Sequence, residues 1–309
     1  MFKKAIIKYL DKTNEKVDER VNSYTYEEPT SLEQIFDLTY SDGAKEHLFD
    51  IFRPIGKTEP QPAIIDIHGG AWYSCYKEVN KRFCMELASQ GFTVFAINYS
   101  LASTSDMKTQ IRDIFSFFNF LENNAQNPNI NVDLNKLFIC GDSAGGQLGA
   151  LALLTLGDNK RKTYFGVDSS LVFSGACFIC GAFDVKKMAR HPITRPFFVN
   201  ILGKGYWRKA ILDQTDFFYS CPLDFPKTLL ISSEDDFLKS HTLKAEKYLS
   251  KYDIDCETIF WGKSKTEKRK LEHVFNVLFP TWEESVETNQ RIADFFRKIY
   301  RLKERENNE

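Results

Sequence analysis

The sequence lacks the marks of several protein classes. Its 309 residues hold 41 basic and 42 acidic side chains, so a net charge of −1 creates no general field for nucleic acid or an anionic membrane. No apolar run approaches the ~18 residues of a membrane span. The first residues also lack the uninterrupted apolar core and small-residue cleavage site of a secretory signal, because Lys8 breaks the run. We therefore predict a cytoplasmic protein with no integral membrane segment and no nucleic-acid partner.

Cysteine is too irregularly placed for a disulfide framework. The seven cysteines are an odd number, which suits a reducing compartment. Cys177 and Cys180 form a C-x-x-C pair inside an apolar run, with no second pair nearby. We favour buried free thiols there over a zinc or redox site. The sequence implies no metal and no organic cofactor.

The composition is that of a folded globular chain. Hydrophobic residues make up 43% and charged residues 27%, with 27 Phe and 13 Tyr. This is enough apolar material for a large core, and it excludes disordered, collagen-like and disulfide-scaffold classes.

Strand-like and helix-like segments alternate along most of the chain. The strand-like runs cover residues 35–40, 47–53, 63–68, 93–99, 136–140, 170–179, 227–232 and 256–261, and the helical stretches cover 80–90, 109–123, 145–156, 240–251 and 284–303. Several runs are almost continuously apolar, as in strands buried on both faces of a parallel sheet. The pattern predicts an α/β fold with a mostly parallel, doubly wound sheet, and the first two strands as an antiparallel edge.

Two stretches fall outside this alternation. Residues 1–28 form a predicted N-terminal helical extension, because apolar side chains recur there at helical spacing. Those side chains are Phe2, Ile6, Ile7 and Leu10. Residues 184–222 hold many aromatics but no clean strand, and we predict a mostly helical cap insertion. Its aromatics either form a small core of their own or line a pocket mouth. The predicted organisation is one domain over residues 1–309.

Gly141-Asp-Ser-Ala-Gly145 lies between a predicted strand and a predicted helix. This is the context of a G-x-S-x-G nucleophile elbow. The turn is so tight that the residues two before and two after Ser143 must be small. The serine hydroxyl then projects above the sheet at a helix N-terminus, where the helix dipole favours developing negative charge. We predict Ser143 as the nucleophile.

His68-Gly-Gly-Ala-Trp72 ends the strand predicted over 63–68. Small consecutive residues let backbone N–H groups face a substrate oxygen, although an ordinary glycine-rich turn is the alternative. The predicted oxyanion hole consists of N–H groups of Gly69, Gly70, Ala71 and Ala144. We expect His68 to hold the loop by hydrogen bonds rather than to act as a base.

The candidate acids and the candidate base follow the last two strands. Glu234, Asp235 and Asp236 come just after the strand at 227–232, where ligands bind in open α/β sheets. His273 follows the strand at 256–261 and is the candidate base. The residues alone do not decide among the three acids.

Together these motifs resemble the α/β-hydrolases of the hormone-sensitive-lipase-like esterase group, of the bacterial acetyl esterase and carboxylesterase type. The matching pieces are His68-Gly-Gly-Ala-Trp72, Tyr99-Ser-Leu-Ala102, Gly141-Asp-Ser-Ala-Gly-Gly146, Glu234-Asp-Asp-Phe-Leu238 and His273-Val-Phe275. Serine, acid and histidine follow one another in the order of that fold. The resemblance implies Asp236 as the acid, since Leu238 stands two residues after it.

Two positions depart from the family pattern. Ala71 stands where the family often has a third glycine. The alanine keeps the backbone N–H group, but its methyl group narrows the space beside the acyl group. This counts against bulky tertiary-alcohol esters as substrates. Val274 replaces a usual glycine after the histidine.

The resemblance implies a serine carboxylesterase for short-to-medium acyl esters of small molecules. His273 would take the proton of Ser143 during attack, and Asp236 would orient His273. Activity should fall at acidic pH, because protonated His273 cannot accept a proton. Two alternatives stay open: a formamidase or amidase acting on an aromatic metabolite, and a non-catalytic binding homologue.

Residues 263–270 form a basic loop with five basic side chains and one acid. A solvated loop is favoured over an anionic-substrate contact, because nothing else in the chain is net basic.

Overall fold

The computed structural model describes residues 8, 12, 15–16, 19–203, 205, 208–222, 224–263 and 269–306. The four apolar residues on which the N-terminal helix prediction rests lie outside this part of the chain. The described residues before residue 21 are all α-helical. They include Lys12, Lys16 and Arg20.

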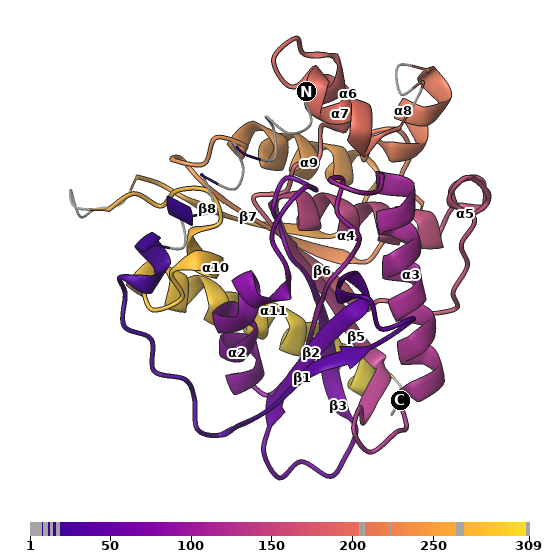
Figure 1. Cartoon of the computed structure of the whole chain (residues 1–309). Helices are drawn as coiled ribbons and strands as arrows, with labels where there is room; N and C mark the ends of the chain where they lie inside the picture. Colours follow the sequence, from indigo (N-terminus) through magenta and orange to yellow (C-terminus); the bar gives the residue numbers. More distant parts are fainter. Residues whose placement is uncertain are drawn as a thin grey trace.

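An eight-stranded sheet forms the centre of the molecule, in the order β1-β2-β4-β3-β5-β6-β7-β8 (Figure 1). The strands are β1 (Leu32–Thr39), β2 (Leu48–Pro54), β3 (Gln61–Ile67), β4 (Thr93–Ile97), β5 (Val132–Asp142), β6 (Gly175–Ile179), β7 (Lys227–Ser233) and β8 (Cys256–Trp261). β2 pairs antiparallel with β1 and with β4, and the remaining pairs are parallel. The predicted doubly wound sheet with an antiparallel edge is confirmed.

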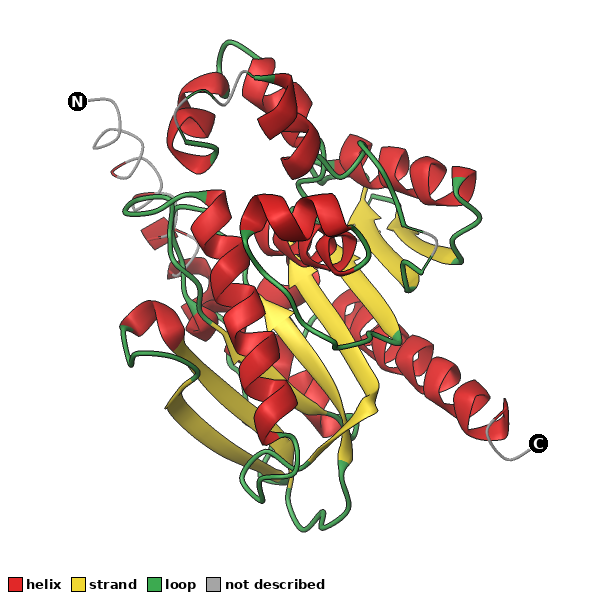
Figure 2. Ribbon diagram, turned by 90° about the vertical axis from the view of Figure 1, so that its right-hand side faces the viewer, coloured by secondary structure: helices red, strands yellow, loops and turns green. Residues whose placement is uncertain are grey.

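Helices cover both faces of the sheet (Figure 2). α2 (Lys81–Ser89) and α11 (Glu283–Glu306) bury their apolar residues on one face, and α3 (Met107–Asn124), α4 (Ser143–Leu156) and α9 (Lys239–Lys251) on the other. Successive strand residues point to opposite faces, so Ile64 joins the first layer and Ile65 the second. Shorter helical elements are η1 (Lys45–His47), η2 (Lys77–Asn80), α5 (Asn159–Phe165) and α10 (Phe275–Leu278). No helix among the described residues is long and apolar enough to cross a bilayer.

Residues 184–222 carry three short helices beyond one end of the sheet (Figure 1). They are α6 (Val185–Arg190), α7 (Arg195–Ile201) and α8 (Lys209–Thr215). Two phenylalanines of this segment are buried: Phe198 contacts Trp72, and Phe217 contacts Phe183. They belong to the core on that face of the sheet.

The strand predicted over 170–179 is wrong in its first half. β6 begins only at Gly175. The preceding residues cross toward α3, where Ser170 bonds the Glu122 carboxylate and the Phe173 ring lies 5.1 Å from that of Phe118. Side-chain contacts with a helix therefore replace strand pairing there.

Candidate active site

Ser143 lies at the junction of β5 and α4 in a strained backbone. Its φ is +51°, a region that non-glycine residues rarely adopt. The turn leaves no space on either side: a Cβ on Gly145 would lie 1.9 Å from the Ile67 carbonyl oxygen, and one on Gly141 would lie 2.6 Å from that of Gly145. These close approaches explain the two glycines of the G-x-S-x-G motif.

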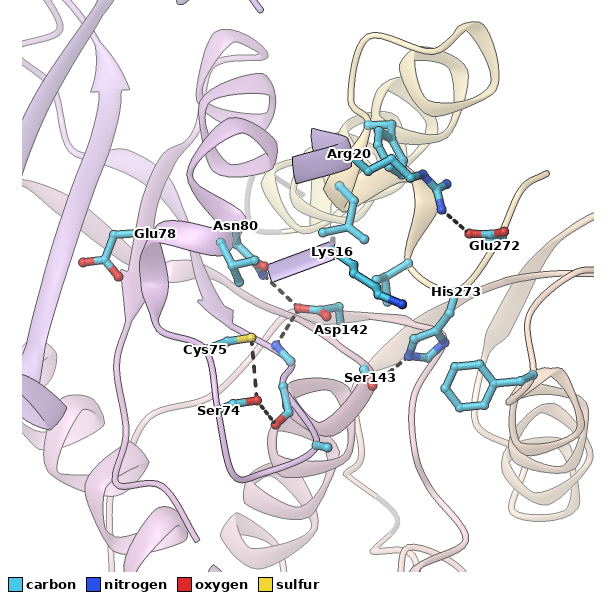
Figure 3. A pocket seen from close by; sticks show the side chains of 18 of the residues that line it. Lys16, Arg20, Ser74, Cys75, Glu78, Asn80, Asp142, Ser143, Glu272 and His273 are labelled. Carbon is cyan, nitrogen blue, oxygen red and sulfur yellow. Dashed lines mark hydrogen bonds and ion pairs between the residues drawn. The ribbon is translucent and has the colours of Figure 1, made fainter. Parts of the chain in front are cut away.

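Three side chains from distant segments meet at the carboxyl ends of β5 and β7. His273 Nε2 lies 2.8 Å from Ser143 Oγ, and His273 Nδ1 lies 2.7 Å from Asp236 Oδ1. Figure 3 shows the His273 ring directed at Ser143. A serine, an imidazole and a carboxylate connected in this way can generate a nucleophile.

Asp236 is held as a carboxylate by its surroundings. The Leu238 N–H donates to Oδ1 at 2.9 Å, and the Ser232 hydroxyl donates to Oδ2 at 2.7 Å. Burial alone would raise the pKa of Asp236, but these bonds and the adjacent His273 outweigh it and lower the pKa below its ordinary value. Of the other two acids, Glu234 pairs with Lys239 at 2.7 Å, and Asp235 lines the cavity without contacting the imidazole.

The loop after β3 presents backbone donors next to Ser143. Gly70 and Ala71 have φ values of +111° and +52°. The Gly69 N–H is already engaged, because it donates to Asp142 Oδ1 at 2.9 Å. Among the described residues no acceptor pairs with the N–H groups of Gly70, Ala71 or Ala144. Ala144 belongs to the first turn of α4, where helix N–H groups lack intrahelical partners.

His68 stabilises this loop through a hydrogen bond and a stacked ring. It is fully buried, its Nδ1 lies 2.7 Å from the Gly69 carbonyl oxygen, and its ring stacks on Tyr99 at 4.4 Å. Burial lowers the pKa of His68 to about 4, so the ring stays neutral. The structural role predicted for His68 is confirmed.

A buried carboxyl pair lies behind the loop. The Asn80 amide donates to Asp142 Oδ1 at 2.9 Å and to Asp66 Oδ2 at 2.8 Å. Burial and the neighbouring Asp142 raise the pKa of Asp66 to about 8, and burial raises that of Asp142 as well. Asn80 and Asp66 carry no motif that would have marked them in the sequence.

The site opens into a cavity of about 1290 Å³. Ser143, His273 and the loop at 69–71 line it, but no described residue of 184–222 does. The N-terminal segment contributes instead, through Lys12, Lys16 and Arg20. Figure 3 shows the last two of these side chains. Basic residues occur here at every fourth position, and this spacing places side chains on one face of a helix. The spacing is the sequence signal from which these three side chains could have been grouped.

Phe237 is a further lining residue that the motifs did not indicate. Its side chain is 75% exposed, and its ring lies 4.3 Å from the His273 ring. Lys270, from the predicted basic loop, also lines the cavity. Residues 264–268 of that loop lie outside the described part of the chain.

Cys180 brings a thiol near the imidazole and the carboxylate. Ligand atoms of Cys180, Asp236 and His273 lie within 4.8 Å of one another, which is the spacing of a metal site. Burial and the nearby Asp236 raise the pKa of the Cys180 thiol far above its ordinary value, so it stays neutral and a weak ligand. As predicted, Cys177 and Cys180 are both free and buried.

Comparison with known proteins agrees with this geometry. A family model described as BD-FAE matches residues 49–236, more than half of the chain. Esterase B from Lactobacillus rhamnosis, solved in an inhibited form, superposes over 100% of both chains with a TM-score of 0.90 at 23% identity. The fold and the site define an α/β-hydrolase of the esterase group. Within it, the chain belongs to the BD-FAE family.

Curated relatives align over shorter stretches. The putative alpha/beta hydrolase R526 of Acanthamoeba polyphaga mimivirus is 34% identical over 107 residues, which are 34% of this chain and 30% of that protein. Kynurenine formamidase of Danio rerio is 24% identical over 163 residues, 52% of this chain and 50% of that protein. The chain thus spans half or less of the length of these relatives.

Proposed function

We propose that this chain is a serine carboxylesterase that hydrolyses short-to-medium acyl esters of small molecules. The observation that carries the proposal is the continuous contact from Asp236 through His273 to Ser143, in a cavity that Gly70 and Ala71 also line. Membership of the BD-FAE family and the likeness to an esterase fold support it.

The reaction follows from these contacts. His273 Nε2 accepts the hydroxyl proton as Ser143 Oγ attacks the ester carbonyl carbon. The negative oxygen accepts hydrogen bonds from the N–H groups of Gly70, Ala71 and Ala144. His273 then donates the proton to the departing alkoxide, which leaves as the alcohol. Water hydrolyses the acyl-enzyme with the same residues in reverse roles, while Asp236 stays ionised and orients the imidazole.

Gly69 has a different part in this proposal. Its N–H is engaged by Asp142, so we assign it to loop positioning rather than to the oxyanion. This narrows the oxyanion hole expected from the sequence to three of its four residues.

A series of p-nitrophenyl esters from acetate to decanoate tests the proposal. Wild type should hydrolyse the short esters, and Ser143→Ala should lose at least about three orders of magnitude in kcat. Ser116→Ala, an exposed serine on α3, is the matched control and should behave as wild type. Retention of activity by Ser143→Ala would refute the proposal.

A formamidase is the second candidate. The 24% identity to kynurenine formamidase of Danio rerio favours it, and the same residues would cleave a formamide. Faster turnover of N-formylkynurenine than of p-nitrophenyl acetate would select this activity. A non-catalytic homologue would bind such ligands but turn over neither.

A further inference from the structure

The N-terminal segment is fixed against the part of the chain that carries His273. Arg20 Nη1 pairs with Glu272 Oε2 at 2.6 Å, and its guanidinium lies 4.7 Å from the centre of the Phe279 ring. The Val21 carbonyl accepts a hydrogen bond from Arg82 Nη1 at 3.1 Å. Because Glu272 directly precedes the histidine, this anchoring makes the segment one wall of the cavity.

Two lysines of this wall line the cavity that also contains the reacting groups. Lys12 and Lys16 line the cavity and are helical, and their spacing of four places them on the same face as Arg20. Figure 3 shows the Lys16 side chain extending toward the space beside Ser143 and His273.

The cavity holds unpaired positive charge. Within the described part of the chain, Lys12, Lys16 and Lys270 have no ion-pair partner, although all three line the cavity.

Three of the four described acids that line the cavity already have partners. Glu272 pairs with Arg20, and Glu78 pairs at 2.9 Å with Lys77, which it shares with Asp37 and Asp50. Burial raises the pKa of Asp142, whose carboxylate also accepts bonds from Gly69 and Asn80. Among the described lining acids Asp235 is the one without such a partner, and it stands against three ammonium groups that have no ion-pair partner. The unpaired charge of the described lining is therefore mainly positive.

We propose that this wall is an anion subsite that selects ester substrates carrying a carboxylate, with Lys16 as its main contact and Lys12 and Lys270 beside it. The inference rests on the proposed esterase function and adds the substrate class. An ammonium group is a compact point charge that attracts a carboxylate without fixing its orientation. The carboxylate therefore belongs to either the acyl or the alcohol part of the ester, and the two are separated experimentally.

Two matched substrate pairs supply the test. 4-Acetoxybenzoate and its methyl ester share the scissile acetyl group and differ in a charge on the alcohol side. Mono-p-nitrophenyl succinate and p-nitrophenyl butyrate differ in a charge on the acyl side. The measured quantity is the ratio of kcat/KM for the charged over the neutral member. We expect Lys16→Gln to lower this ratio about fivefold in one pair, and Lys16→Glu to lower it further.

Lys8→Gln is the control. It removes one positive charge from the same segment, as Lys16→Gln does, but Lys8 does not line the cavity. It should leave the ratio unchanged. Equal ratios in wild type and Lys16→Gln for both pairs, or an equal loss in Lys8→Gln, would overturn the subsite.

Binding gives a readout that does not depend on turnover. Calorimetry should show that Ser143→Ala binds one of the two charged esters, 4-acetoxybenzoate or mono-p-nitrophenyl succinate, about fivefold more tightly than the Ser143→Ala/Lys16→Gln double variant does. If wild type hydrolyses none of the esters, the esterase proposal fails, and this binding difference still decides the subsite. Equal affinities of the two variants for both charged esters would refute it.

Discussion

Val274 adopts a backbone conformation that its side chain disfavours. Its φ is +53°, and β-branched residues are genuine outliers in this region. Such a residue stores on the order of 1–3 kcal/mol of strain, which the surrounding structure must hold in place. Here the Val274 N–H donates to Cys180 Sγ at 3.4 Å, and the side chain is buried. A glycine, which the family resemblance leads us to expect directly after His273, would adopt this conformation without that strain.

Asp236 carries a prediction of its own. Asp236→Asn keeps the size of the side chain but replaces the charge that orients the imidazole. Since the wrong tautomer of His273 cannot accept the Ser143 proton, kcat should fall by roughly four orders of magnitude, with KM little changed. Steady-state kinetics on p-nitrophenyl acetate measures both constants. Glu234→Gln, at the neighbouring surface acid, serves as the control, and a loss of similar size there would contradict the assignment.

The residues of the candidate site differ in how well the sequence predicts them. Ser143 and the loop glycines stand in motifs whose spacing reflects steric demands of the turn, so they were predictable. Lys16 was not, because its relation to His273 depends on the docking of segments more than 250 residues apart. Phe237 could be located in the sequence only as the residue after the acid, without any indication that it covers the imidazole.

At the scale of elements, the loop at 68–72 depends on Asp142. This carboxylate accepts bonds from the Gly69 N–H and the Asn80 amide, each at 2.9 Å. Asp142→Ala leaves two buried donors unpaired, and it should lower the free energy of unfolding by about 1–3 kcal/mol and reduce kcat as the loop shifts.

Asp142→Asn separates the two effects of this carboxylate. The amide oxygen can still accept both bonds, so stability and kcat should stay closer to wild type than in the alanine variant. Urea denaturation and ester kinetics on the same preparations provide the comparison. Equal losses in the two variants would show that charge, not hydrogen bonding, positions the loop.

Hydrogen bonds of Arg161 connect α5 with the carboxyl-terminal part of the segment at 184–222. Its fully buried guanidinium donates to the carbonyl oxygens of Gln214, Asp216 and Ser220, at 3.3, 3.2 and 3.1 Å. Arg161→Met has similar length but no donors, so it should destabilise the protein by about 1–3 kcal/mol and speed hydrogen exchange in residues 208–222. If the variant exchanges its amide hydrogens faster only outside residues 208–222, this role of Arg161 is contradicted.

The elements were predicted to different degrees. Strands such as β3 and β7 were predicted closely, because most of their residues are buried on both faces and their apolar runs are almost continuous. β6 was predicted five residues too long, since an apolar residue such as Phe173 packs equally well on a helix. α10 has only four residues and begins directly after the strained Val274, so no helical period could reveal it.

At the scale of the whole molecule, we propose a single α/β-hydrolase domain over residues 1–309. Residues 184–222 are its cap, although none of their described residues lines the cavity, and residues 1–28 are an N-terminal extension, of which Lys12, Lys16 and Arg20 line the cavity. The aromatic contacts of the cap and the Arg20–Glu272 ion pair support this organisation.

The buried Asp66 predicts how stability depends on pH. Its pKa in the folded protein, about 8, lies above that of an unfolded chain, so folding favours the protonated form. The contribution of Asp66 to the free energy of unfolding should therefore fall as pH rises from about 4 to about 8, by at most about 1.4 kcal/mol per pH unit, and level off above that range. The raised pKa of Asp142 acts in the same direction.

Urea denaturation at several pH values checks this prediction. Asp66→Asn places a neutral side chain of the same shape next to Asn80, so its stability should change less with pH than that of wild type. Parallel curves for the two proteins would show that Asp66 is not the source of the dependence.

The central claim is that Ser143 is the nucleophile of an ester hydrolase. The most direct measurement is inactivation with p-nitrophenyl butylphosphonate, followed by peptide mapping by mass spectrometry. The account predicts release of one equivalent of p-nitrophenol, complete loss of esterase activity and an adduct on the peptide that contains Ser143. It also predicts that Ser143→Ala is not labelled. An adduct on another residue, or hydrolysis that persists in the fully labelled protein, would contradict it.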